Sequence, residues 1–455
     1  MVRTKQISVL IFLIVIFFAG CENSDKEQTK KTNLMKEKQI TFSDHNHVLD
    51  NNDNFSPDDR FLCYDTRGTV FNEDIGNCKS IEKVEIATGK ETVLYSPESI
   101  TGEKAAPGVG AVSYHPFENS VIFIHGPFVD EVENRGYYGK PNRTGFIVVA
   151  DGSRHFTKAD MRDVETGRPT TPGAHRGGTH RHEYSRNGNR IGFTYDDLLS
   201  QEYARTIGYM EKNEKAPAGY SHYFALLVKP AKKGESKPGE IEMAHADSWV
   251  DAAGTMRAFI GKVRAENGTD YEEDLFVVDV PEDVDITTAF AGNGNEYPTA
   301  PEGLKIRRLT HGMNAGGIVR GSYNGKFIAF YAPDRNNINQ IFVIPSDGSD
   351  RSSDKSKHPE QVTFFESDAS FLRWHPSDKW ILSVVNGNIA ASYVGKDNNF
   401  GKTFLLTNDT LKRDQLVVSH SGNKIAYGIS LRSENQKRDY KQIFVMDFDW
   451  EKLIK

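Results

Sequence analysis

Three features missing from the sequence each exclude a class of protein. There is no excess of positive charge, and a net charge of −7 excludes a nucleic-acid partner, because phosphate recognition needs a basic surface. There is no amphipathic run of about 12 or more residues that predicts a long helix. There is also no G-x-S-x-G sequence, so a serine peptidase with an α/β-hydrolase domain is not expected.

Long apolar runs are scarce as well, and the one at the N-terminus has the layout of a secretory signal peptide. Arg3 and Lys5 precede the apolar run Ile7–Phe18, and small residues lead to Cys21, as in exported proteins. The run is too short for a membrane span. Because small residues before a cysteine resemble a bacterial lipobox, residues 1–21 are expected to be a lipoprotein signal peptide. Lipid on Cys21 would then anchor the exported chain at the outer membrane, with ordinary signal cleavage as the alternative.

Cysteine is rare, with three residues in the chain. With Cys21 lipidated, Cys63 and Cys78 remain. An even pair in an exported protein allows a disulfide between them. Two buried free thiols are the alternative.

Residues 22–54 are polar, charged and poor in aromatic side chains. Such a segment cannot bury enough apolar surface to fold, so it is expected to be a flexible tether. The remaining residues, 55–455, are long enough for a large core. The 39 glycines and 11% aromatic content of the whole chain fit a turn-rich β protein.

A repeated phrase organises this region. Each copy has a Ser, His or Tyr position, a turn of Pro, Asp, Asn or Gly, a basic or polar residue, and then an apolar strand. A second apolar run and a turn follow most copies. Short strands repeated at intervals of tens of residues indicate propeller blades, so the sequence predicts an all-β, seven-bladed β-propeller. The seven copies begin at Phe55, Tyr114, Tyr184, Val250, Ser322, Trp374 and Ser419.

The segment from Arg154 to Arg190 contains four histidines and seven arginines. Histidine exchanges protons near neutral pH, and arginine pairs with carboxylate or sulfate through two parallel hydrogen bonds. A local site for an anionic ligand is therefore expected in this acidic chain. His180 and His182 are two residues apart, which on a regular strand places both on one face, so a structural metal ion bound there is a further hypothesis.

The sequence of this segment resembles a known family. PGAHRGGTHRHEYSRNGNRIGFTYDD from Pro172, with SYHPFENSVIFIHGP from Ser113 and TGFIVVADGSRHF from Thr144, is similar to the seven-bladed propeller ulvan lyases of polysaccharide lyase family 25. TolB-like propellers have a similar core. The resemblance covers about Phe55 to Asp449, and its sharpest block, HRGGTHRHEY, is typical of the wider group.

The resemblance implies cleavage of ulvan, a sulfated, uronate-containing polysaccharide, by β-elimination. A base removes the C5 proton of the uronate, and an acid protonates the leaving O4. Matching by motif, the resemblance assigns these two roles to His155 and Tyr220, in either order. His175 would orient substrate or catalytic groups, and Tyr223 is the second choice of tyrosine. No cofactor is required, and a monomer is expected.

A cationic group must also neutralise the uronate carboxylate. No arginine of this chain matches the family at that position, so the assignment is a hypothesis. Arg257 is the first choice because it precedes an apolar strand, although it could instead pair with Asp247 or Asp251. Arg320 and Arg176 are the other expected contacts to substrate.

Two alternatives remain open. One is a non-catalytic, TolB-like envelope propeller that binds protein or glycan. The other is a metal-dependent lyase of the oligogalacturonate type, whose activity needs a histidine-bound divalent ion. The sequence leaves open which residue is base and which is acid, the preferred uronate, endo or exo cleavage, and the membrane face.

Overall fold

A computed structural model describes residues 36–49, 53–68, 74–98 and 108–453. The chain divides into Met1–Thr32 and Asn33–Lys455, and every described residue belongs to the second unit. The predicted signal peptide and Cys21 lie outside the described residues. Within the described ranges, no helix has the length and apolar character needed to cross a membrane.

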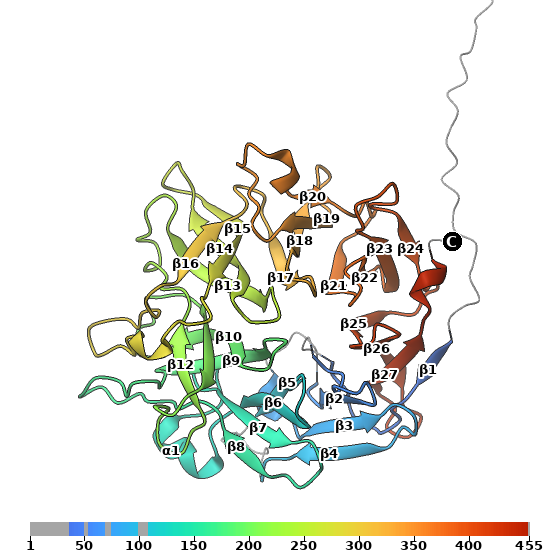
Figure 1. The fold of residues 1–455 in the computed structure, drawn as a ribbon. Coiled ribbons are helices and arrows are strands. Elements are labelled where there is room, and N and C mark those ends of the chain that lie inside the picture. Colours follow the sequence, from blue (N-terminus) through green and yellow to red (C-terminus); the bar gives the residue numbers. More distant parts are fainter. Residues whose placement is uncertain (1–35, 50–52, 69–73, 99–107, 454–455) are drawn as a thin grey trace, which may run out of the picture. The chain divides into compact units, whose positions relative to one another are not determined.

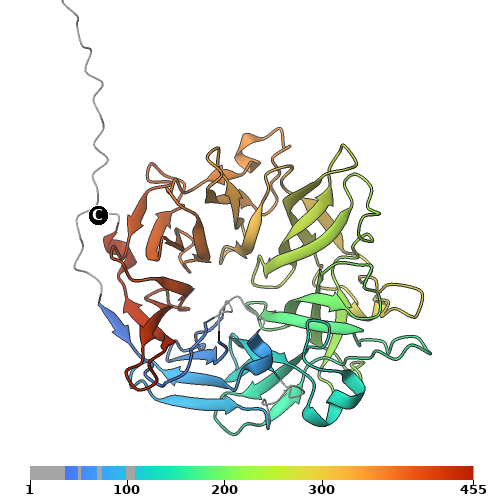
Figure 2. The ribbon, with the colours of Figure 1, turned by 180° about the vertical axis from the view of Figure 1, so that it is seen from behind.

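Seven antiparallel sheets surround a common centre, which confirms the predicted all-β, seven-bladed propeller (Figure 1; Figure 2 shows it from behind). Blade one contains β2 (Phe61–Asp65), β3 (Ile81–Glu85) and β4 (Glu91–Tyr95). Blade two contains β5 (Val109–Tyr114), β6 (Ser120–His125), β7 (Thr144–Val149) and β8 (Phe156–Lys158). Blade three contains β9 (Gly177–Tyr184), β10 (Arg190–Asp197), β11 (Thr206–Lys212) and β12 (His222–Leu226).

The second half of the ring continues the pattern. Blade four contains β13 (Ile241–Trp249), β14 (Met256–Arg264), β15 (Tyr271–Asp279) and β16 (Lys305–Arg308). Blade five contains β17 (Gly316–Gly321), β18 (Phe327–Pro333), β19 (Asn339–Pro345) and β20 (Glu360–Gln361). Blade six contains β21 (Ala369–Trp374), β22 (Trp380–Val385), β23 (Asn388–Tyr393) and β24 (Thr403–Leu405). Blade seven contains β25 (Arg413–Val418), β26 (Lys424–Arg432), β27 (Asp439–Asp447) and β1 (Glu37–Gln39).

Among the residues that the structure describes, helical structure is limited to short pieces outside the blades. They are α1 (Val132–Arg135) and the 3₁₀ turns η1 (Asp74–Asn77), η2 (Val129–Glu131), η3 (Ile286–Thr288), η4 (Lys355–Lys357) and η5 (Trp450–Lys452).

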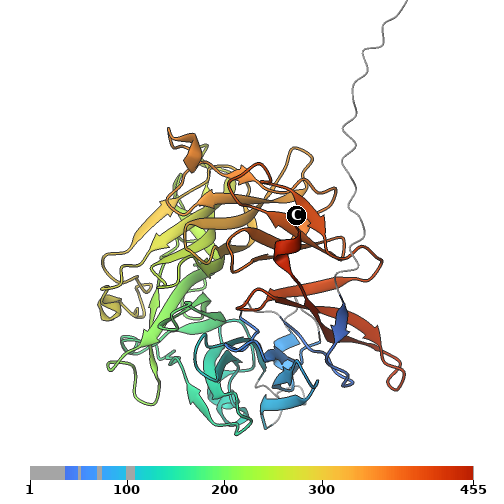
Figure 3. The same cartoon turned by 45° about the vertical axis from the view of Figure 1, so that its right-hand side comes forward.

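The ring closes through the N-terminal strand. β1 pairs with β27 in the register Glu37↔Met446, and Figure 3 shows blue β1 against the red C-terminal strands. Ile40, Val48 and Leu49 are buried just after it. The predicted tether is therefore wrong for residues 36–49, which belong to the propeller. Composition suggested disorder, but the partner that orders this segment lies about 400 residues away in sequence, beyond any local pattern.

The seven repeated phrases coincide with the turns between the first and second strands of the blades. In blade one the inner position is occupied by two isolated bridges to β2, Val48↔Asp65 and Phe55↔Leu62. These turns also connect neighbouring blades. The Asp378 carboxylate accepts hydrogen bonds from the backbone N–H of Tyr323 at 2.6 Å and of Asn324 at 2.9 Å, and Asp59 accepts one from His420 at 2.8 Å. The phrase recurs because the same turn makes the same kind of contact around the ring.

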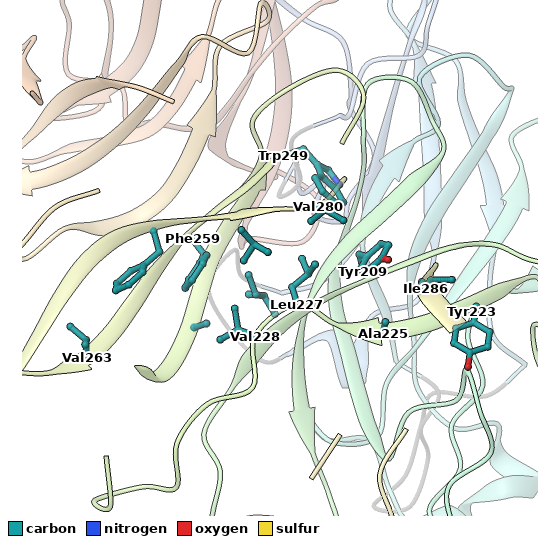
Figure 4. Packing of buried hydrophobic residues seen from close by; sticks show 14 residues of the cluster. Tyr209, Tyr223, Ala225, Leu227, Val228, Trp249, Phe259, Val263, Val280 and Ile286 are labelled. Carbon is teal, nitrogen blue, oxygen red and sulfur yellow. The ribbon is translucent and has the colours of Figure 1, made fainter. Parts of the chain in front are cut away.

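The apolar core lies between blades. One cluster joins Tyr209 and Tyr223 of blade three to Trp249 and Phe259 of blade four (Figure 4). Large side chains on the facing surfaces of two sheets exclude water from both. Each blade is therefore stabilised by its neighbours, so closure of the ring matters to every blade.

Six inner strands contain a β-bulge, at which the register with the second strand shifts. Each bulge has a residue with positive φ. A bulge breaks the alternation of side chains and re-aims them, so residues next to each other on an inner strand can both face the centre. The positive-φ residues are Ala111, Arg181, Ala246, Gly317, Phe371 and Gln415.

Cys63 and Cys78 are free and fully buried, so the disulfide hypothesis is wrong and the alternative of two buried thiols is confirmed. The backbone of β2 and the segment before β3 place the two residues in one apolar cluster without joining them. Burial raises the pKa of the Cys78 thiol to about 12, which keeps it protonated and unreactive.

Candidate functional site

A basic cleft of about 460 Å³ lies where β9, β17 and β21 face one another at the centre of the ring. Its described lining includes His180 but no aspartate or glutamate. Side chains of one sign converge there from several blades, although the chain as a whole is acidic. The cationic lining residues are Arg67, Lys140, Arg143, Arg181, Arg205 and Arg373.

Two of the bulges shape this cleft. Arg181 has φ of 59° and Phe371 has φ of 52°, a conformation that costs a non-glycine residue about 1–3 kcal/mol. The bulge at Arg181 lets it line the cleft beside its neighbour His180. Arg373 follows the bulge at Phe371 and enters the same cleft from β21. The strained positions therefore aim positive charge at the channel.

The arginines of the channel repel one another. Burial and the charges of Arg320 and Arg181 lower the pKa of Arg373 to about 9. Burial also lowers the pKa of Arg320 to about 10, although the Glu183 carboxylate acts in the opposite direction. Arg320 and Arg373 share a second cavity with Glu183. An anion entering the channel would relieve this repulsion. Arg320 lines the second cavity, together with the Asp53 and Glu183 carboxylates, and not the basic cleft, so its role as a substrate contact stays a prediction.

His180 is a neutral hydrogen-bond donor in this cleft. Its Nδ1 lies 2.9 Å from Nη1 of Arg143, and because a guanidinium only donates, Nδ1 accepts and the ring proton is on Nε2. Burial and the charges of Arg143 and Arg205 hold the pKa of His180 well below its usual range. His180 can therefore donate to an anion from Nε2, but it is unsuited to bind a cation.

The predicted metal pair of His180 and His182 is not formed. The bulge at Arg181 separates their directions, so His182 points into the packed interior, where its Nε2 lies 3.0 Å from the Thr179 hydroxyl. A Cβ at Gly145 would lie 3.1 Å from this Nε2, so the glycine leaves room for the ring. The prediction assumed regular alternation along the strand, which the bulge removes.

His175 is a buried structural residue. It is 0% exposed, and its Nε2 lies 3.4 Å from the Asp160 carboxylate, with the rings of Tyr195 and Phe224 around it. Burial by itself would raise the pKa of Asp160, but the hydrogen bond with His175 and the histidine charges lower it to about 2. The His175–Asp160 pair stabilises the long connection between β8 and β9.

His155 lies at the end of blade two that is opposite to Asp160, the partner of His175. Its carbonyl accepts from the backbone N–H of Val149, at the end of β7, whereas Asp160 accepts from Gly145 near the start of that strand. Four residues of strand correspond to about 13 Å. His155 is exposed in the β7–β8 turn, too far from buried His175 for both to act on one sugar.

The two predicted tyrosines lie outside the lining of the basic cleft. Tyr220 is half-buried before β12, next to Ser221, whose N–H donates to Lys158. Burial raises the pKa of the Tyr220 hydroxyl. Tyr223 is 2% exposed and belongs to the apolar core, packed against Gly173. The structure therefore does not assemble His155, His175 and a tyrosine in one cleft.

Arg257 and Arg176 are internal cross-links, not substrate contacts. Arg257 is 1% exposed and pairs with Glu183 at 3.0 Å and with Asp247 at 2.6 Å. Arg176 is 0% exposed and pairs with Asp197 at 3.0 Å. Both predictions are wrong because carboxylates from elsewhere in the fold already neutralise these charges.

Sequence reasoning missed Arg143 and Arg373. Arg143 carries no local signal, since its role depends on contact with His180 in another blade. Arg373 does have a local sequence signal. It lies two positions before His375, and Arg320 lies two positions before Ser322 at the same place in the previous repeat. That position faces the channel in both blades.

Comparisons with known proteins identify a family. A family described as a protein of unknown function, DUF3748, matches residues 108–215, which include the His/Arg segment. The uncharacterized protein YidR of Escherichia coli strain K12 is 31% identical over 425 residues, which are 86% of this chain and 94% of YidR.

Two solved structures illustrate the likeness to other propellers. The β-propeller domain of the Trilobed protease from Pyrococcus furiosus is 7% identical, with a TM-score of 0.48 over 90% of this chain and 95% of that chain. TolB from Acinetobacter baumannii is 12% identical, with a TM-score of 0.31 over 64% of this chain and 51% of that chain. These comparisons give no support to an ulvan lyase in particular. On the similarity to YidR along nearly its whole length, the chain belongs to the YidR family.

Proposed function

We propose that this protein is an exported propeller that binds an acidic polysaccharide, bearing carboxylate or sulfate groups, in the basic cleft. The observation that carries the proposal is the convergence of six cationic side chains on one cleft in a chain with a net charge of −7. Two of them, Arg67 and Arg205, are paired with Asp65 and Asp196, so Lys140, Arg143, Arg181 and Arg373 are the main candidates for contact with the ligand. The planar guanidinium fork suits carboxylate and sulfate oxygens.

A glycan suits the cleft better than a small inorganic anion. Its volume of about 460 Å³ falls in the range of pockets that enclose an organic ligand. Tyr331, Phe371 and Leu372 contribute apolar surface to the lining, against which the faces of sugar rings can pack. The guanidinium groups and Nε2 of His180 would bind the acidic substituents.

Ulvan cleavage by β-elimination is the second candidate. The observation that favours it is the same group of arginines, because neutralising the uronate carboxylate is the first requirement of abstracting the C5 proton. The proton-transfer roles proposed for His155 and Tyr220 would have to be met at the cleft by other groups, since neither residue lines it. His180 cannot accept a proton at Nδ1 while Arg143 donates to it.

The test is binding of ulvan, pectin fragments and alginate to the purified protein by calorimetry at low and high salt. We expect binding that weakens as salt rises. Arg373→Gln should weaken it at least about 10-fold, since a hydrogen bond to a charged group is worth about 1.5–3 kcal/mol. The exposed Arg351→Gln is the matched control, and thermal melts verify that both variants are folded.

Absorbance of the unsaturated uronate product, followed in the same samples with and without chelator, tests the second candidate. A rise on any of the three polysaccharides supports elimination, and its loss with chelator would favour the metal-dependent type. The binding proposal fails if none of the three polyanions binds at low salt, or if Arg373→Gln binds as tightly as the unaltered protein.

A further inference from the structure

The segment that follows β1 connects the last blade to the first. The backbone N–H of His47 donates to the carbonyl of Lys441 in β27 at 3.0 Å, and that of Val48 donates to Asp65 in β2 at 2.8 Å. The Asn46 side chain accepts from the N–H of Lys441 at 2.8 Å. This segment is therefore held between blades seven and one, at the point where the ring closes.

Three possible metal ligands meet at this point. Donor atoms of His45, His47 and Glu91 all lie within 4.8 Å of one another. Nε2 of His47 is 3.4 Å from Oε1 of Glu91, and Nε2 of His45 is 3.3 Å from Oε2 of Glu82. Two ligand bonds of about 2.0–2.1 Å at a tetrahedral angle place their donor atoms about 3.4 Å apart. Both distances match the edge of such a tetrahedron.

The protonation of His47 points to a ligand. Its Nδ1 lies 2.9 Å from the Lys441 carbonyl, which can only accept, so the ring proton is on Nδ1 and Nε2 offers a lone pair. His47 is 0% exposed, and its Nε2 has no hydrogen-bond partner among the described residues. This nitrogen faces the Glu91 carboxylate at 3.4 Å, an arrangement that either a bound cation or a second ring proton stabilises. A histidine that donates from one nitrogen to a carbonyl and presents the other is the usual arrangement in metal sites.

The carboxylates are also held in place. Glu91 accepts from the N–H of Phe42 at 3.2 Å and from the Ser43 hydroxyl. Glu82 accepts from the hydroxyl of Tyr64 at 2.9 Å and from that of Ser80 at 2.5 Å. Such outer partners fix the orientation of ligands before the metal arrives.

We propose that His45, His47 and Glu91 bind one divalent transition-metal ion, and that the ion fastens the closure of the propeller. Two imidazoles with carboxylate oxygens are a ligand set that zinc accepts. His45 and Glu91 retain 35% and 18% side-chain exposure, so an ion can enter from solvent. The site is separate from the basic cleft and does not depend on its function.

The experiment uses the full chain without added histidines, dialysed against a chelator and then titrated with Zn²⁺ in competition with a chromophoric chelator. We expect one zinc per chain and a melting temperature that keeps rising with zinc concentration, because the ion binds only the folded state. Co²⁺ should give the visible absorption of a tetrahedral site.

His45→Gln and Glu91→Gln should each lower the zinc affinity at least about 100-fold, since loss of even an outer partner costs about 10- to 100-fold. His311→Gln is the matched control, because His311 also pairs with a carboxylate, that of Asp350 at 2.7 Å, outside the described metal-ligand cluster. It should leave zinc binding unchanged.

Two results would overturn the proposal. One is a melting temperature that does not respond to zinc in the unaltered protein, which would leave protonated histidines paired with Glu82 and Glu91 as the explanation of the short distances. The other is zinc binding by His45→Gln and Glu91→Gln that equals the binding of His311→Gln.

Discussion

Replacement of Arg257 by methionine distinguishes an internal cross-link from a substrate contact. In the folded protein, this arginine neutralises two carboxylates, Glu183 at 3.0 Å and Asp247 at 2.6 Å. Both carboxylates are at least nine-tenths buried, with side-chain exposures of 7% and 5%. Methionine has a similar length but no charge, so it would leave two buried negative charges facing each other.

The expected cost follows from this geometry. Removing one partner of a buried ion pair costs about 3–5 kcal/mol. The lower end applies here, because the Ser248 hydroxyl at 2.7 Å and the backbone N–H of Trp249 at 3.2 Å still donate to Glu183. We therefore expect Arg257→Met to lower the free energy of unfolding by about 3 kcal/mol.

Urea unfolding followed by tryptophan fluorescence measures this loss, and polysaccharide binding is measured in parallel on the folded variant. Arg307→Met is the matched control: its pair with Asp279 has a 2.7 Å contact but 22% and 32% exposure, so it should cost less than about 1 kcal/mol. The reasoning is refuted if Arg257→Met unfolds at the same urea concentration as the unaltered protein and loses binding instead.

Three further predictions concern the ring, the thiols and the response to acid. A chain beginning at Phe55 should show no cooperative unfolding transition in thermal melts, because it lacks β1 and its pairing with β27; a folded product would contradict the revised boundary. Cys63 and Cys78 should resist a thiol reagent until the protein is denatured, and reductant should leave the melting temperature unchanged, since both are free and buried. The pKa of His182 is lowered from 6.5 to about 4 by burial, so its protonation should cost stability as pH falls from about 6.5 towards 4. The pKa of Asp160 is lowered from 3.8 to about 2, so its contribution is present above about pH 4 and lost as pH falls towards 2. The shifts correspond to about 3 kcal/mol for His182 and about 2 kcal/mol for Asp160. Stability curves of the unaltered protein and Asp160→Asn should differ in both parts, because the variant has no carboxylate at this position to lose below about pH 4 and because the Asp160 charge raises the pKa of His182.

The fold was predictable because its signals are local. Turn residues followed by alternating apolar residues mark the hairpin between the first two strands of a blade, and the seven copies appear in the sequence in the order of the blades. The basic cleft was predictable only in part. The sequence predicted an anion site in the His/Arg segment, and His180 and Arg181 of that segment do line the cleft. The residues assigned to substrate within it, His175 and Arg176, are instead buried in the interior.

The sequence by itself determined the number of blades and the position of their turns, because hairpin geometry depends on a few adjacent residues. Only the tertiary structure decided which charged groups are already paired. That Arg257 is enclosed with Asp247 and Glu183 in the interior, and that Arg373 lines the basic cleft, depends on contacts between distant strands. The bulge at Arg181 likewise separated two histidines that regular alternation would have placed together. Short-range backbone preference specifies the blades, whereas long-range electrostatics and packing specify what their side chains can do.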